Sequence, residues 1–226
     1  MYKAVIFDLD GTLLDTLEDL ANACNYALAE CGFPIHQVEK YRRFVGDGRY
    51  KLIQRIIPEN KKTPETLNKV LSLYDEYYEK HMMDKTKPYC GIIELLDGLN
   101  EKGLKLAVVS NKPHEFTTKV VKTIFGDRLQ LVLGQRVDFP TKPDPAIVFE
   151  VFKNFKVTPD ECIYVGDSNV DIMTAKNAGI KSIGVAWGFR GKDELEAEGA
   201  DFIAYTAQEL GELILNAASR KWLAIY

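Results

Sequence analysis

Apolar and polar residues follow two different periodicities along this chain. Short, nearly continuous apolar runs occupy residues 4–7, 106–109 and 162–165, as expected of strands buried on both faces of a parallel sheet. From residue 89 onward such runs alternate with helix-like intervals, which is typical of βαβ units. The predicted strands cover residues 4–7, 104–109, 129–133, 161–165 and 181–185, with a short one near Phe202. The pattern therefore predicts an α/β fold with a mostly parallel sheet.

The spacing of apolar residues between the first strand and residue 86 is helical instead. Three amphipathic helices are predicted there: one from about residue 17 to a stop at Gly32, one over 49–57 ended by Pro58, and one that follows Thr63. No convincing strand occurs in residues 15–85. We therefore expect a Rossmann-like, doubly wound core of residues 1–14 and 86–226, interrupted by an inserted all-helical cap domain of residues 15–85.

Polar side chains follow three of the predicted strands at the point where each strand ends. They are Asp8, Asp10, Gly11 and Thr12 after residues 4–7, Ser110 and Asn111 after residues 106–109, and Asp167 after residues 162–165. Open parallel sheets bind ligands at the carboxyl ends of their strands, so these groups are candidates for one common site. Lys142 precedes a predicted helix for which Asp144 is suited to the cap and Pro145 to the first helical position.

Composition narrows the possible functions. The chain has 226 residues, of which 46% are hydrophobic, so one core with a sizeable insertion is expected. A net charge of −4 and a pI near 5.5 argue against a nucleic-acid partner, and no apolar run approaches the length that spans a bilayer. The N-terminal residues lack a leader pattern. We expect a cytoplasmic protein, monomeric or homodimeric, that acts on a small molecule.

The polar motifs, in this order, resemble those of the haloacid dehalogenase-like phosphohydrolases. That superfamily carries Asp-x-Asp-x-Thr, then Ser or Thr, then Lys, then Gly-Asp-x-x-x-Asp, which here correspond to residues 8–12, Ser110, Lys142 and 166–171. Asn111-Lys112-Pro113 and Trp187-Gly188-Phe189-Arg190 are similar to the phosphoglycolate phosphatase branch. The resemblance spans the whole chain and implies a phosphatase that forms an aspartyl phosphate.

The resemblance implies a role for each motif residue. Asp8 is expected to be the nucleophile and Asp10 the general acid and base, as suits two neighbouring carboxyl groups with different protonation states. The phosphate group would be bound by Gly11, Thr12, Ser110, Asn111 and Lys142. Mg²⁺ would be held by Asp8, Asp10 through its backbone carbonyl, and Asp167, since hard cations prefer oxygen ligands.

Two assignments are less direct. Asp171 is expected to support the metal, but Ser168-Asn169-Val170-Asp171 also has the pattern of a helix cap with an acidic third position. Gly46, Gly48 and Arg49 lie between the first two predicted helices and could form a plain connector. In the resembling family such a loop of the cap contacts the distal end of the substrate, where Arg49 would pair with a carboxylate or a second phosphate.

Other activities fit the same motifs. A sugar phosphomutase shares them, but mutases of this superfamily usually carry a histidine in the first cap helix, where this chain has Leu20. Cleavage of inorganic pyrophosphate is a further alternative. An inactive binding or regulatory protein of the same fold is disfavoured, because both Asp8 and Asp10 are present. Hydrolysis of a small phosphate monoester, with phosphoglycolate first among the candidates, is the preferred interpretation.

Overall fold

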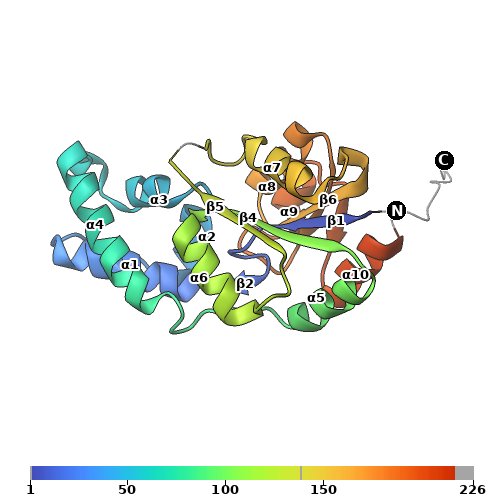
Figure 1. Ribbon diagram of the computed structural model, residues 1–226. Coiled ribbons are helices and arrows are strands. Elements are labelled where there is room, and N and C mark those ends of the chain that lie inside the picture. Colours follow the sequence, from blue (N-terminus) through green and yellow to red (C-terminus); the bar gives the residue numbers. More distant parts are fainter. Residues whose placement is uncertain (1, 138, 217–226) are drawn as a thin grey trace.

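A six-stranded parallel sheet forms the centre of the computed structural model, which describes residues 2–137 and 139–216 (Figure 1). Its order is β5-β4-β1-β6-β7-β8, and every neighbouring pair is parallel. The strands are β1 Ala4–Phe7, β4 Lys105–Pro113, β5 Leu131–Gln135, β6 Cys162–Gly166, β7 Lys181–Val185 and β8 Phe202–Ala204. After β5 the chain crosses β1 to form β6, so the direction of winding reverses between β1 and β6. This is the predicted doubly wound topology.

Both faces of the sheet are covered by helices, as the apolar runs predicted. In β1, Val5 and Phe7 belong to one apolar cluster and Ala4 and Ile6 to another, since successive side chains of a strand point to opposite faces. The first cluster includes buried residues of α5 Ile92–Glu101, α6 His114–Phe125 and α10 Ala207–Asn216. The second includes those of α7 Ala146–Phe155 and α8 Asn169–Ala178. The short α9 Lys192–Ala197 packs beside β7 and β8.

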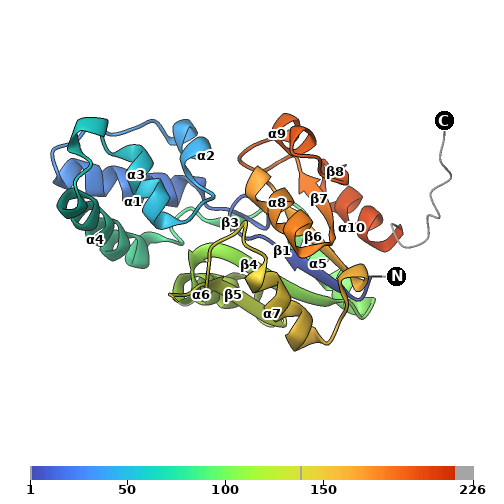
Figure 2. The ribbon, with the colours of Figure 1, turned by 90° about the horizontal axis from the view of Figure 1, so that it is seen from above.

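A helical segment lies at one end of the sheet (Figure 2). Its helices are α1 Leu17–Glu30, α2 Tyr41–Phe44, α3 Arg49–Ile56 and α4 Pro64–His81, with 3-10 turns at Val38–Lys40 and Glu59–Lys61. The longest of them, α4, begins at an N-cap, where the Thr63 side chain accepts a hydrogen bond from the Thr66 N–H. Helices α1 and α4 pack against each other and bury their apolar stripes. The segment is the predicted helical insertion; the bounds of a cap domain at residues 15 and 85 stay a prediction.

The insertion joins the core through a small second sheet. Strand β2 (Leu14–Asp15) pairs antiparallel with β3 (Lys87–Pro88), so the chain leaves and re-enters the core side by side. The prediction that residues 15–85 contain no strand was wrong at Asp15. Two residues carry no periodicity that could reveal a strand.

Other elements depart from prediction by small amounts. Strand β5 covers Leu131–Gln135 instead of 129–133; before its first residue, the Gln130 side chain accepts the Leu106 N–H in place of a main-chain carbonyl. Helix α7 begins at Ala146, with Pro145 as its N-cap and Asp144 Oδ1 accepting the Ala146 N–H at 2.9 Å. Within the described residues, no helix is both long and apolar enough to cross a membrane.

Candidate active site

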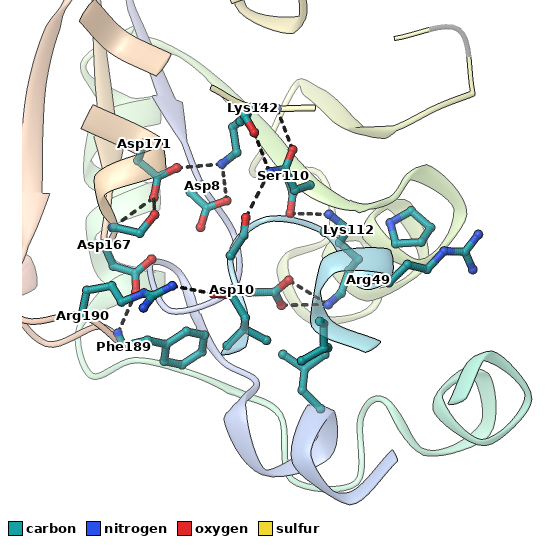
Figure 3. Close-up of a pocket in the computed structure, with 18 of the residues that line it drawn as sticks. Asp8, Asp10, Arg49, Ser110, Lys112, Lys142, Asp167, Asp171, Phe189 and Arg190 are labelled. Carbon is teal, nitrogen blue, oxygen red and sulfur yellow. Dashed lines mark hydrogen bonds and ion pairs between the residues drawn. The ribbon is translucent and has the colours of Figure 1, made fainter. Parts of the chain in front are cut away.

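The predicted polar residues meet at the carboxyl edge of the sheet (Figure 3). They lie near β1 and β6, between which the direction of winding reverses. Asp8 directly follows β1, Asp167 directly follows β6, and Ser110 lies in the last part of β4. Lys142 reaches the same point from the loop between β5 and α7. Their side chains line one cavity of about 60 Å³. Since one water molecule needs about 10–15 Å³, this cavity has room for several waters.

Lys142 is the centre of the buried charge cluster. Its Nζ lies 2.7 Å from Asp8 Oδ1 and 2.7 Å from Asp171 Oδ1, and it also donates to the Tyr164 hydroxyl at 3.0 Å and the Val109 carbonyl at 3.2 Å. Only 4% of this lysine is exposed. Since a buried ammonium needs partners on every side, these oxygens hold it in one position.

Three buried carboxylates, two of which contact Lys142, lie close enough together to share a cation. Asp8, Asp167 and Asp171 each offer an oxygen within 4.8 Å of the others, and all three are buried. Asp167 is oriented by the Phe189 N–H, which donates to its Oδ2 at 2.7 Å, and by the Thr12 hydroxyl at 3.4 Å. The donor set is entirely oxygen, which suits a hard cation such as Mg²⁺.

Asp171 caps its helix, which is one of the two roles that the sequence left open, and it also contacts Lys142. Its Oδ2 accepts hydrogen bonds from the Ser168 N–H and hydroxyl, so it completes the capping box at the start of α8. Its Oδ1 faces Lys142, as described above. The residue that caps the helix thus also presents a carboxylate to the cluster. The role of Asp171 in supporting a metal stays a prediction.

The crowding of acids shifts their protonation. Burial raises the pKa of the Asp8 carboxyl to about 7, since Lys142 offsets only part of the lost hydration and Asp171 opposes ionisation further. Burial, together with Asp171 and Asp8, raises the pKa of Asp167 well above its usual range. Burial alone would lower the pKa of Lys142, but Asp171 and Asp8 raise it well above its usual range. One lysine therefore does not compensate for the burial of these acids and for their mutual repulsion.

Glycines allow the main chain to close around Asp167. Gly11 has a φ of +91°, and a Cβ there would lie 2.3 Å from Asp167 Oδ2. A Cβ at Gly188 would lie 2.2 Å from Asp167 Cβ. Any side chain at either position would displace the carboxylate, so glycine is required at residue 11 by close approach as well as by its positive φ.

Asp10 has a partner that the sequence analysis missed. Its two carboxylate oxygens lie 2.9 and 2.8 Å from Lys112 Nζ. This lysine is buried and sits 4.9 Å from the centre of the Tyr78 ring of α4. Burial opposes its charge, but Asp10 raises the pKa of Lys112 above its usual range. The signals in the sequence were the position of Lys112 directly after Ser110 and Asn111 and its place in the Asn111-Lys112-Pro113 segment, neither of which indicated Asp10 as its partner.

Ser110 and Asn111 differ in what their side chains contact. Ser110 is 2% exposed, lines the cavity, and accepts the Lys112 N–H at 3.2 Å, which leaves its hydroxyl proton able to donate. The Asn111 amide donates to the Gly46 and Lys142 carbonyls and accepts the Lys142 N–H. It therefore fixes the Lys142 main chain and the loop before α3, and its predicted contact with phosphate stays a prediction.

Gly46, Gly48 and Arg49 all line the cavity, and the predicted contact of this loop with substrate stays a prediction. The guanidinium of Arg49, however, is ion-paired with Asp75 of α4 and extends away from Asp8 and Lys142 (Figure 3). Leu20, Val45, Leu52 and Tyr74 complete the wall that the helical segment contributes.

Comparison with known proteins agrees with this geometry. Residues 5–185 match the model of the haloacid dehalogenase-like hydrolase family. Phosphoglycolate phosphatase of Vibrio parahaemolyticus is 32% identical, covering 96% of this chain and 97% of that protein. The enzyme of the same name from Nitrosospira multiformis is 33% identical over 96% of this chain and 97% of its own length.

Among solved structures, a protein of Lactobacillus delbrueckii subsp. bulgaricus superposes with a TM-score of 0.90 at 38% identity. The match covers 94% of this chain and 98% of that one, which is provisionally assigned as a phosphoglycolate phosphatase. The similarity thus extends over core and helical insertion alike. On its motifs, its fold and these matches, the chain belongs to the haloacid dehalogenase-like hydrolase family.

Proposed function

We propose that this protein is a Mg²⁺-dependent phosphatase that hydrolyses a small phosphate monoester, with phosphoglycolate as substrate. The observation that carries the proposal is the convergence of Asp8, Lys142 and Asp167 on one small cavity beside Asp10. A carboxylate nucleophile, a fixed cation and metal-ligating oxygens are the groups that phosphoryl transfer requires.

The residues fit the proposed metal. Asp8 and Asp167 supply carboxylate oxygens within reach of one ion, and Asp171 either joins them or holds the water around it. Burial raises the pKa of both Asp8 and Asp167, and neighbouring carboxylates raise it further; a divalent cation would favour the ionised form of both groups. When bound, Mg²⁺ supplies positive charge that offsets repulsion between the carboxylates and the phosphoryl group.

The reaction would take two steps at Asp8. A carboxylate oxygen of Asp8 attacks phosphorus, a bond forms between them, and the ester P–O bond breaks as Asp10 gives its proton to the leaving oxygen. Water then attacks the phosphorus, Asp10 takes the proton from that water, and the bond between phosphorus and Asp8 breaks to release phosphate. Lys142 and Ser110 would donate to the phosphoryl oxygens throughout.

Asp10 must leave Lys112 at least in part to carry this proton. The present contacts place its carboxylate against the ammonium, at the side of the cavity that faces α4. Lys112 would hold Asp10 while it is ionised, between the two steps, and the proton that Asp10 takes from water in the second step is the one that it gives to the next leaving group. We expect substrate binding to redirect one Asp10 oxygen toward the leaving group.

Hydrolysis is favoured over phosphoryl transfer to a second sugar. Leu20 of α1 lines the cavity at the position where related mutases usually carry a histidine. An apolar side chain there offers no second proton carrier for a sugar hydroxyl.

The test measures phosphate release from phosphoglycolate, pyrophosphate, nucleoside monophosphates, hexose phosphates and an aryl phosphate, with Mg²⁺ and with chelator. We expect turnover only with Mg²⁺ and the highest kcat/KM for phosphoglycolate. Asp8→Asn should abolish turnover, and Asp10→Asn should depress it strongly without unfolding the protein. Asp127→Asn, at an exposed carboxylate outside the cavity, is the matched control and should behave as wild type. Full activity in purified Asp8→Asn protein would refute the assignment of the nucleophile.

A further inference from the structure

Arg190 differs from the other cations that line the cavity. Among the described residues these are Arg49, Lys112, Lys142 and Arg190. The first three each bind a carboxylate: Arg49 binds Asp75, Lys112 binds Asp10, and Lys142 binds both Asp8 and Asp171. Arg190 donates to the Val45 carbonyl at 2.9 Å, while its Nε lies 3.8 Å from Glu194 Oε1, beyond hydrogen-bond distance.

This guanidinium is largely removed from water. Its side chain is 13% exposed, whereas Glu194 is 36% exposed and screened accordingly. A guanidinium has five N–H donors in a planar fork, and one carbonyl satisfies few of them. Because the Glu194 carboxylate lies 3.8 Å away and is partly exposed, it compensates the largely buried Arg190 charge only in part, so the cavity favours a further anion beside Arg190.

The position of Arg190 is set by the catalytic cluster itself. The Phe189 N–H binds Asp167, and the Trp187 indole N–H donates to the Thr12 carbonyl at 3.0 Å. The loop after β7 is therefore anchored on both sides of the metal-ligating carboxylate. Figure 3 shows the Arg190 side chain directed from this loop toward the middle of the cavity, near Asp10, while Arg49 extends away on the opposite side.

We propose that Arg190 binds the carboxylate of the substrate, at the end remote from phosphorus, through two parallel N–H···O bonds. The proposal rests on the proposed function and identifies the substrate class as short phosphate esters that carry a second anionic group. The size of the cavity limits the separation between the two anionic ends. A carboxylate fits the planar fork of arginine better than a hydroxyl or methyl group does.

Arg190 would also connect recognition with the helical segment. Its hydrogen bond to Val45 crosses from the core to the loop that precedes α3, beside the bond from Asn111 to Gly46. Arg42 of α2 makes the reverse connection, donating to the Gly188 carbonyl at 3.1 Å, but it does not line the cavity. Arg42 is therefore a control that separates core–cap contact from substrate contact.

The experiment compares phosphoglycolate with ethyl phosphate, which lacks the carboxylate, in wild type and in Arg190→Gln, Arg190→Lys and Arg42→Gln proteins. Arg190→Gln should lower the ratio of kcat/KM for phosphoglycolate to that for ethyl phosphate at least about tenfold, mainly through KM. Arg190→Lys should recover part of this selectivity, because the charge is kept and the fork is lost. Arg42→Gln should change both substrates alike.

Two results would overturn the proposal. One is a ratio within about twofold of wild type in Arg190→Gln protein whose melting curve shows it folded; the other is an equal loss of selectivity in Arg42→Gln. A second readout does not depend on turnover: calorimetric binding of phosphoglycolate and of inorganic phosphate to Asp8→Asn protein, with and without Arg190→Gln. Wild-type protein inactive on every ester would refute the proposed function, whereas unchanged phosphoglycolate affinity in the double variant would refute the role of Arg190.

Discussion

Replacing Lys142 with methionine tests the charge balance of the site most directly. Methionine keeps much of the volume and the unbranched shape but removes the ammonium that lies 2.7 Å from both Asp8 and Asp171. Three buried carboxyl groups then share the cavity without a protein cation in contact. The variant therefore isolates the electrostatic contribution of one atom.

The expected loss of stability depends on pH. Breaking a buried ion pair by removing one partner costs about 3–5 kcal/mol, and we expect a loss in this range at pH 8 in the absence of metal. The folded pKa of Asp8, about 7, lies above its unfolded value, so this carboxyl is largely protonated at pH 5.5 and has less attraction to lose. The loss should therefore be smaller at pH 5.5, by about 1–2 kcal/mol, and should grow as the pH rises.

Equilibrium unfolding in urea with chelator present, followed by circular dichroism at pH 5.5 and pH 8, measures both quantities. Lys153→Met is the matched control, since Lys153 is exposed on α7, and it should change stability by less than about 0.5 kcal/mol. A Lys142→Met protein that loses under 1 kcal/mol at pH 8, or the same amount at both pH values, would contradict the reasoning. With Mg²⁺, kcat of this variant should fall about 10²–10³-fold.

Three further changes test other parts of the site. Gly11→Ala should lower Mg²⁺-dependent turnover about 100-fold, because its Cβ would lie 2.3 Å from Asp167 Oδ2. The control is Gly103→Ala, at a φ of +78° in open space, which should lower stability by only about 1–2 kcal/mol and leave activity unchanged. Mg²⁺ affinity measured by calorimetry should rise from pH 6 to pH 8, because the ion must displace the proton of the Asp8 carboxyl, whose pKa is about 7; an affinity independent of pH would contradict this. Tyr164→Phe should cost about 1 kcal/mol in thermal melting and much less activity than Lys142→Met, because it removes one hydroxyl 3.0 Å from the Lys142 ammonium; a larger loss of activity would mean that the hydroxyl acts in the reaction.

The residues that meet at the site were predictable because local and global patterns coincide there. The apolar runs that end at Asp8 and Asp167 mark strands buried on both faces, and parallel strands bring their carboxyl ends to one edge. The helix cap at Ser168 was readable in the same way, since a capping box is defined within four consecutive residues.

The partners of these residues were not predictable, because they depend on tertiary contact. Lys112 and Asp10 are separated by 102 positions and Asn111 and Gly46 by 65, and nothing local distinguishes such a lysine from a solvated one. Arg49 directly follows the glycine-containing segment 46–48, yet its guanidinium is paired with Asp75 on the neighbouring helix. Pairings of this kind follow from how the helical segment sits on the sheet.

The two-stranded sheet of β2 and β3, which joins the core to the helices, has a mechanical consequence. Its paired positions are Leu14 with Pro88 and Asp15 with Lys87. Beside them the buried Asp19 carboxylate accepts the Lys85 and Thr86 N–H groups, which binds the returning strand to the first helix. Because the two chain segments that join the core and the helices lie side by side, a rotation that admits a ligand would turn about these few residues. The four helices would then move together as a rigid body relative to the sheet.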